Sequence, residues 1–138
     1  MKGKAIMQSW QNPCYPDSHR TIVFDFDGVV HRNSKGFYDG TIYDEPTKHI
    51  RSIFKHLKNN GYLIAINSCK LRNDRPKANN KTGEELIVEW LCKYDLTRFV
   101  DILEAEKTPG ILYVDDKALR FNQEYNLEQF LNVMEALK

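Results

Sequence analysis

Residues 21–30 read TIVFDFDGVV, an apolar run that ends in two carboxylates two residues apart. β-Branched and aromatic residues occupy both faces of this run, as is typical of a strand that is covered on two sides. Side chains two apart on a strand share a face, so Asp25 and Asp27 can address one ligand while Phe26 packs into the core. Because burying even one unpaired charge is costly, the pair indicates a ligand site at the end of a buried strand.

The rest of the chain alternates between strand and helix patterns. Strands are predicted at three further short apolar runs, residues 62–66, 99–103 and 111–114. Helical spacing of apolar residues predicts helices over residues 46–60, 85–91 and 126–137, the last one capped by Asn126. The residues expected on the buried faces of the first and last helices are Ile50, Ile53, Phe54 and Leu57, and Leu127, Phe130, Leu131, Met134 and Leu137. We therefore expect an α/β fold with a three-layer, Rossmann-like, mostly parallel sheet and helices on both faces.

The length of 138 residues and the hydrophobic content of 41% suit one domain. We expect an irregular N-terminal arm over residues 1–20, where Pro13 and Pro16 interrupt any helix, and one domain over residues 21–138. A formal net charge of +1 does not demand nucleic acid or an anionic membrane as a partner. Three widely spaced cysteines, together with the lack of a secretory or membrane-spanning apolar run, lead us to expect a soluble cytoplasmic protein without a membrane partner.

Polar residues follow three of the predicted strands. They are Asp25 and Asp27 after the first, Ser68 after the second, and Asp115 and Asp116 after the last. Ligands bind beyond the carboxyl ends of the strands in such a sheet. Four carboxylates close together repel one another unless a divalent cation, a lysine or a proton intervenes, and Mg²⁺ best fits a set of oxygen ligands. A calcium loop is excluded, because its sixth and twelfth positions would be Val30 and Gly36 instead of glycine and glutamate.

In this order the motifs resemble those of the haloacid dehalogenase-like (HAD) superfamily of phosphotransferases, over roughly residues 21–121. The first motif is matched by Asp25-Phe26-Asp27-Gly28-Val29, the second by Ser68, the third by Lys107 and the acidic fourth by Asp115-Asp116. Neither interval between the first three motifs has room for a cap domain. The resemblance therefore implies a small capless HAD phosphatase.

The resemblance implies a magnesium-dependent phosphomonoester hydrolase that works through an aspartyl-phosphate. Asp25 would attack phosphorus, and Asp27 would act as the general acid and base. Ser68 would hydrogen-bond a phosphoryl oxygen, and Lys107 would neutralise charge. Mg²⁺ would be held by Asp25, by Asp27 through its backbone carbonyl, and by Asp115 or Asp116, of which we favour Asp116.

The loop after Ser68 is the expected substrate contact, through Ser68, Cys69, Lys70 and Arg72. Residues 68–82 hold five basic residues and one acidic residue, a net charge of +4, whereas residues 84–106 hold seven acidic and two basic residues, a net charge of −5. An open site beside a basic loop suits a phosphorylated small molecule, a nucleotide or a polynucleotide end. The candidates to stack on a base are Phe37, Tyr38 and, in the N-terminal arm, Trp10. Two alternatives stay open: a merely solvated loop, and a non-catalytic phosphate-binding or interaction module on the same fold.

Overall fold

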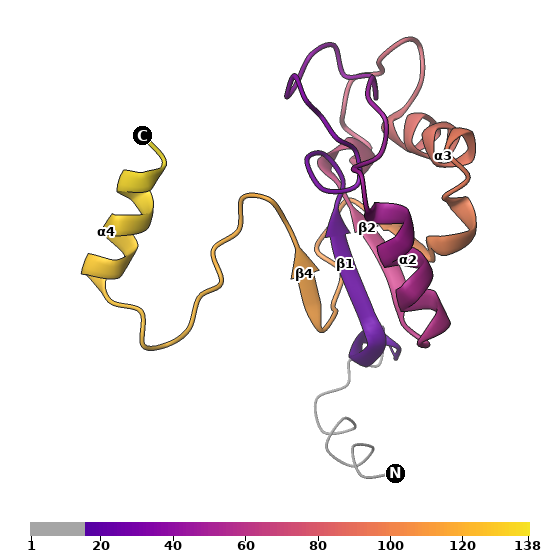
Figure 1. Cartoon of the computed structure of the whole chain (residues 1–138). Coiled ribbons are helices and arrows are strands. Elements are labelled where there is room, and N and C mark those ends of the chain that lie inside the picture. The colour runs from indigo at the N-terminus through magenta and orange to yellow at the C-terminus, as the bar shows by residue number, and fades with distance from the viewer. Residues whose placement is uncertain (1–15) are drawn as a thin grey trace.

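Four short parallel strands form one sheet in the computed structural model, which describes residues 16–138 (Figure 1). They are β1 (Thr21–Asp25), β2 (Leu63–Asn67), β3 (Ile102–Glu104) and β4 (Leu112–Val114), in the order β3-β2-β1-β4. The strands pair in register, with Asp25 opposite Asn67 and Asn67 opposite Glu104. The predicted α/β class and parallel sheet are thus confirmed, and the arrangement is consistent with a Rossmann-like fold.

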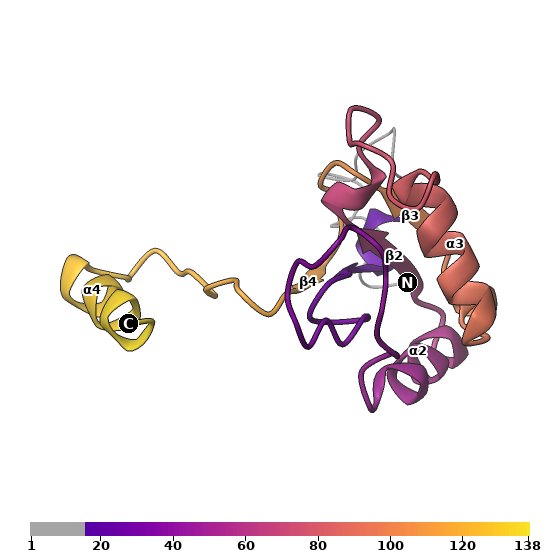
Figure 2. The ribbon, with the colours of Figure 1, turned by 90° about the horizontal axis from the view of Figure 1, so that it is seen from above.

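Helices α2 (Ile50–Asn59) and α3 (Gly83–Lys93) cover the same face of the sheet (Figure 2). Apolar side chains of β1 and β2 point to this face and pack with both helices into one buried cluster. The Phe54 ring of α2 sits at its centre, with its centroid 5.0 Å from that of Phe24 and 6.4 Å from that of Phe99. The expectation of helices on both faces is wrong for the described residues.

Residues 105–111 cross the opposite face of the sheet as irregular chain. A Cβ atom added to Gly110 would lie 2.8 Å from the Thr21 carbonyl oxygen and from Cγ2 of Val23, so this segment lies directly on β1. The crossing leads from β3 at one edge to β4 at the other, over three strand spacings of about 4.8 Å each. A helix rises only about 1.5 Å per residue, so seven helical residues would be too short to span this distance. The segment must therefore be extended, and it cannot form a helix that covers this face.

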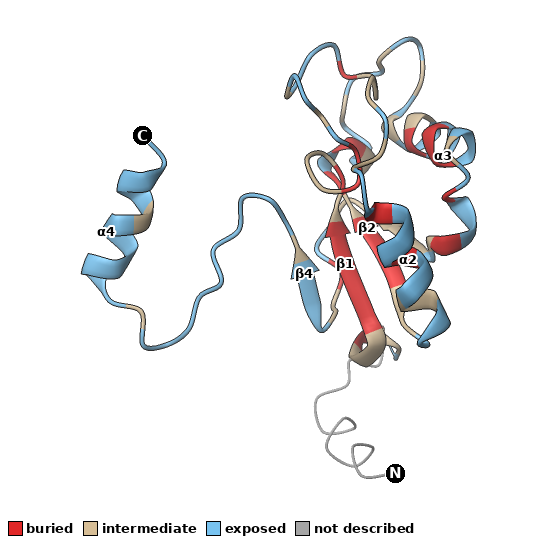
Figure 3. Cartoon of the chain, in the orientation of Figure 1, coloured by how far each residue is buried: buried red, intermediate tan, exposed pale blue. Residues whose placement is uncertain are grey.

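Helix α4 (Leu127–Ala136) stands apart from the sheet, at the end of the extended segment 115–126 (Figures 1 and 2). Its predicted cap is confirmed, because the Asn126 side chain accepts a hydrogen bond from the Gln129 backbone amide at 2.9 Å. Its predicted buried face is wrong. None of its residues is buried, as the pale blue of Figure 3 shows. Capping and periodicity are local properties, whereas docking depends on the path of the connecting chain.

Several element limits differ from the sequence prediction. Helix α2 begins at Ile50 and not near Pro46, because the Thr47 amide and hydroxyl bond the carbonyls of Val30 and Val29 and hold this stretch against the strand end. Ile53 is 44% exposed, so its expected burial is wrong. Strand β3 begins after a short 3-10 helix, η3 (Thr97–Phe99).

Most of the expected N-terminal arm lies outside the described residues. Its last part, Ser18–Arg20, forms a short 3-10 helix, η1, that leads directly into β1. Across the described residues, no helix combines the length and the apolar character needed to cross a membrane.

We predict that Phe54→Ala destabilises the protein far more than Phe130→Ala. Phe54 is 0% exposed in the core, so its truncation is expected to cost about 3–5 kcal/mol of unfolding free energy. Phe130 on α4 is 45% exposed, and its truncation is expected to stay within about 0.5 kcal/mol. Urea denaturation followed by circular dichroism measures both values. Equal losses would show that α4 is part of the core.

Candidate functional site

Three carboxylates gather at the carboxyl ends of β1 and β4. Asp25 is the last residue of β1, and Asp115 and Asp116 directly follow β4. Because Phe24 pairs with Val114, the residues that come next emerge side by side. One carboxylate oxygen from each of the three lies within 4.8 Å of the others. This group could hold a metal ion, and it joins three of the four residues that the sequence predicts as metal ligands.

The environment of Asp25 disfavours its charged form. Burial, followed by the charge of Asp115 and smaller effects of Asp116 and Asp27, raises the pKa of Asp25 to about 6. The hydrogen bond from the Phe26 backbone amide lowers the pKa but does not cancel these effects. A cation bound among the three carboxylates would reverse the repulsion and restore the ionised form of Asp25.

The carboxylate of Asp27 has different partners. His31 Nδ1 lies 2.8 Å from Asp27 Oδ1, and Lys70 Nζ lies 2.9 Å from Oδ2. The Asp44 backbone amide donates to His31 Nε2 at 3.1 Å, which leaves Nδ1 as the protonated nitrogen that donates to Asp27. Burial alone would raise the pKa of Asp27, but the bonds from His31 and Lys70 outweigh it and lower the pKa below its usual value. Asp27 is therefore an ionised acceptor, and its carboxylate lies outside the acidic group.

A tight loop after β1 sets the positions of these groups. The Phe26 carbonyl accepts hydrogen bonds from the backbone amides of Val29, Val30 and His31. Gly28 adopts a φ of +88°, and a Cβ atom there would overlap the carboxylate of Asp116. Glycine is thus required at this point both for the backbone turn and for the approach of the second acidic pair.

Ser68 and Lys70 are held by the start of the 3-10 helix η2 (Cys69–Leu71). Ser68 is buried, its amide donates to the Glu104 carbonyl at 3.2 Å, and its Oγ accepts from the Lys70 amide at 3.1 Å. Lys70 is itself buried. The first residue of α3, Gly83, lies so close to the Lys70 carbonyl that any Cβ would overlap it. Helix α3 therefore fixes η2, and through it the ammonium that bonds Asp27.

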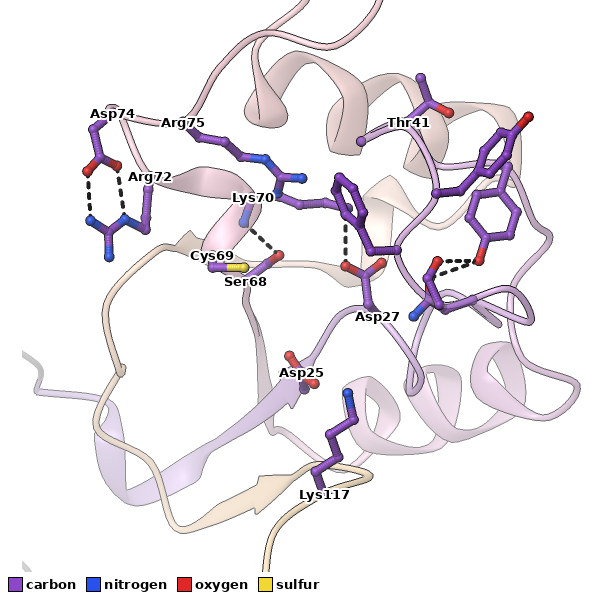
Figure 4. Close-up of a pocket in the computed structure, with 16 residues that line it drawn as sticks. Asp25, Asp27, Thr41, Ser68, Cys69, Lys70, Arg72, Asp74, Arg75 and Lys117 are labelled. Atoms are coloured by element: carbon purple, nitrogen blue, oxygen red, sulfur yellow. Dashed lines mark hydrogen bonds and ion pairs between the residues drawn. The ribbon is translucent and has the colours of Figure 1, made fainter.

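A cleft of about 580 Å³ opens above the strand ends (Figure 4). Its lining includes six of the residues that the sequence predicts for catalysis or substrate binding: Asp25, Asp27, Ser68, Cys69, Lys70 and Arg72. These residues come from the end of β1, from the loop that follows it and from the segment after β2. The structure thus brings the first two predicted motifs into one open cavity.

Lys107 is not among the residues that line this cleft. Its Nζ lies 4.6 Å from the ring centroid of Tyr113, whose register partner Val23 points to the face crossed by residues 105–111. The lysine that lines the cleft is Lys117, directly after the acidic pair, and Figure 4 shows its side chain pointing toward Asp25. The sequence analysis did not predict Lys117 as a site residue, although its position directly after the acidic pair could have indicated that it lies near the site.

The sequence analysis also missed His31, and it counted Arg75 in the basic loop without assigning it to the site. His31 is fully buried and lies four residues after Asp27, a spacing that suits a local hydrogen bond once the chain turns at Gly28. Arg75 lines the cleft, whereas Arg72 is held by two hydrogen bonds to Asp74, at 2.9 and 2.7 Å. The bond to Asp74 leaves Arg72 less available to a ligand than the sequence suggests.

Comparisons of this chain with protein-family models, with curated protein sequences and with solved structures gave no match. The chemistry of the cleft itself therefore has to carry any functional inference.

We predict that the Asp25 carboxyl titrates near pH 6 in the metal-free protein. The folded state binds this proton more tightly than the unfolded state, so the stability that the proton adds is complete below pH 3.8 and lost as the pH rises through about 6. Carbon-13 NMR of the carboxyl groups measures the pKa. Asp115→Asn should lower it, because a repelling charge is removed, whereas Asp74→Asn at the cleft rim serves as the control. A wild-type pKa near 3.8 would contradict the described surroundings of Asp25.

Proposed function

We propose that this protein is a cytoplasmic, magnesium-dependent phosphomonoester hydrolase of the HAD type, without a cap domain, that works through an aspartyl-phosphate. The observation that carries the proposal is the placement of two aspartates two residues apart in opposite surroundings. Asp25 stands in the acidic group at the strand ends, and Asp27 is held by His31 and Lys70. Free thiols at Cys69 and Cys92 suit a reducing compartment.

The donor set fits Mg²⁺, which prefers oxygen ligands and few protein carboxylates. Asp25, Asp115 and Asp116 would hold the ion. Burial, and after it the charges of the neighbouring carboxylates, raises the pKa of Asp25, and such an ion would offset that repulsion. Asp27 would contribute its backbone carbonyl, since both oxygens of its carboxylate are already bonded. The bound ion would supply charge neutralisation at the phosphoryl group.

In the proposed first step an oxygen of Asp25 attacks phosphorus, the bond from phosphorus to the ester oxygen breaks, and the leaving alcohol takes a proton. Asp27 is ionised in the free protein, so it must gain this proton when the substrate binds; the charge of the phosphate favours that, because it raises the pKa of a nearby carboxyl. In the second step Asp27, ionised again, accepts a proton from the water that attacks the aspartyl-phosphate, and inorganic phosphate leaves.

Other residues of the cleft would bind and orient the phosphoryl group. The Oγ of Ser68 accepts a hydrogen bond from the Lys70 amide, which leaves its own proton free for a phosphoryl oxygen. Lys117, and not Lys107, is the cation suited to neutralise charge beside Asp25. Lys70 acts through Asp27, since its ammonium bonds that carboxylate and holds it in the cleft.

The second candidate function is a non-catalytic phosphate-binding or interaction module. Lys117 and Arg75 line the cleft without a carboxylate partner among the described residues, and such cations could hold a phosphate without cleaving it. A binding module, however, has no need for a carboxylate whose charge is disfavoured by three others. The surroundings of Asp25 therefore favour the hydrolase, whose substrate would be a phosphorylated small molecule or a polynucleotide end.

We predict that Asp25→Asn lowers magnesium-dependent hydrolysis of an aryl phosphate by about 10³-fold or more, because the amide cannot attack phosphorus. The assay follows release of the phenolate with Mg²⁺ and with a chelator, and circular dichroism checks that the variant is folded. Asp95→Asn, at an exposed carboxylate that does not line the cleft, is the matched control and is expected to keep its activity.

Two results would contradict the proposal. Full activity of Asp25→Asn would remove Asp25 as the nucleophile. A wild-type protein that binds inorganic phosphate but hydrolyses no member of a broad phosphomonoester panel would be a binding module.

A further inference from the structure

One wall of the cleft is formed by the flap, residues 33–43, which joins the loop after β1 to α2. Tyr43 anchors the flap: its hydroxyl accepts from the Lys35 amide at 2.8 Å and donates to the Gly36 carbonyl at 2.6 Å. Its ring packs edge-on against His31, with centroids 5.2 Å apart. The flap is thus tied to the same histidine that bonds Asp27, and its side chains have a defined position over the cleft.

The flap presents one aromatic ring that no other ring contacts in the described part of the chain. Phe37 lines the cleft and is 78% exposed. Tyr38 lines the cleft as well, but its ring packs against Tyr43 at 6.0 Å and lies under the Lys35 ammonium at 4.8 Å. A ligand that covers this ring removes apolar surface from water, which favours binding. Phe37 therefore offers a free face for a flat, apolar group.

The cations of the cleft divide into two kinds. Lys70 and Arg72 are bonded to Asp27 and Asp74. Arg75 and Lys117 have no carboxylate partner among residues 16–138. Figure 4 shows the two on different sides of the cavity, with Asp25 and Asp27 between them. The cleft thus has an unpaired cation, Arg75, away from the lysine that points toward Asp25.

Arg75 lies beside the flap. A Cβ atom added to Gly40 would come within 3.8 Å of its Nη2. The free guanidinium and the free aromatic ring therefore belong to the same wall of the cleft. A ligand that satisfies both must combine a planar ring with a second polar or anionic group, at some distance from the phosphate at Asp25.

We infer that the cleft recognises a phosphomonoester that carries a nucleobase, with the base stacked on Phe37 and Arg75 bonded to the sugar or to a further phosphate. This inference rests on the proposed function, since it names the substrate class of the same site. A cavity of about 580 Å³ holds a ligand of that size. Any base can stack on an aromatic side chain. The site is therefore expected to select phosphomonoesters that carry a base, without preferring one base over another.

The test measures binding in the Asp25→Asn variant, which keeps the cleft but cannot hydrolyse its ligand. Calorimetry compares a nucleoside 5′-monophosphate with ribose 5-phosphate, which has the same phosphate and sugar but no base. We expect the nucleotide to bind about 5- to 150-fold more tightly, the range that stacking of one base supplies. Adding Phe37→Ala should remove this preference, whereas adding Phe37→Trp should keep it.

A matched control is Phe121→Ala. Phe121 is 67% exposed but does not line the cleft, so the preference for the nucleotide should survive its truncation. Oligonucleotides with a 3′- or 5′-phosphate form a second arm. A polynucleotide end is identified as the source of the base if the oligonucleotide binds more tightly than the mononucleotide and its affinity falls steeply with salt concentration. In that case the salt dependence should be weaker in the Arg75→Gln variant. Equal binding with a weak salt dependence would identify a free nucleotide.

Equal affinity for nucleotide and ribose phosphate would overturn the inference, as would a preference that survives Phe37→Ala. These failures are distinct from a failure of the proposed hydrolase. A protein that hydrolyses aryl phosphate without any preference for a base keeps the hydrolase and loses the base site. A protein that prefers nucleotides in the binding assay but hydrolyses nothing keeps the base site and loses the hydrolase.

Discussion

Repulsion between carboxylates at the strand ends is the constraint on which the rest of the site depends. Asp25, Asp115 and Asp116 bring carboxylate oxygens within 4.8 Å of one another. Among residues 16–138 no basic side chain forms an ion pair with them, and Lys117 donates only its backbone amide to Asp115, at 2.8 Å. The cost is visible in the pKa of Asp25, which rises to about 6 chiefly through burial and the charge of Asp115. The fold must therefore hold these groups against a force that separates them.

That holding force comes from a short strand pairing. β4 pairs with β1 over three residues at the edge of the sheet, from Leu112 to Val114, and this pairing places the second acidic pair beside the first. Gly28 then gives Asp116 the room to approach. Strand β4 is exposed on much of its surface, and the extended chain leads directly away from it (Figure 3). The acidic group is thus assembled by one of the least buried parts of the sheet.

Asp25 and Asp27 illustrate how two neighbouring carboxylates come to differ. Both belong to one short stretch, yet the pKa of Asp25 is raised while that of Asp27 is lowered. Asp25 faces other carboxylates, whereas Asp27 faces the buried pair of His31 and Lys70. Opposed surroundings of this kind assign different roles to chemically identical groups. Helix α3 takes part in this division, since its first turn fixes the segment that carries Lys70.

Apolar periodicity and short spacings were enough to predict the α/β class, the parallel strands and five polar residues at strand ends: Asp25, Asp27, Ser68, Asp115 and Asp116. Those patterns did not predict that both packed helices share one face, that α4 stays exposed, or that Lys117 lines the cleft in place of Lys107. Each of those outcomes depends on the path of a connecting segment across or away from the sheet. That path depends on the distance in space that a connecting segment must span between two strands. A local pattern of residues does not contain this distance.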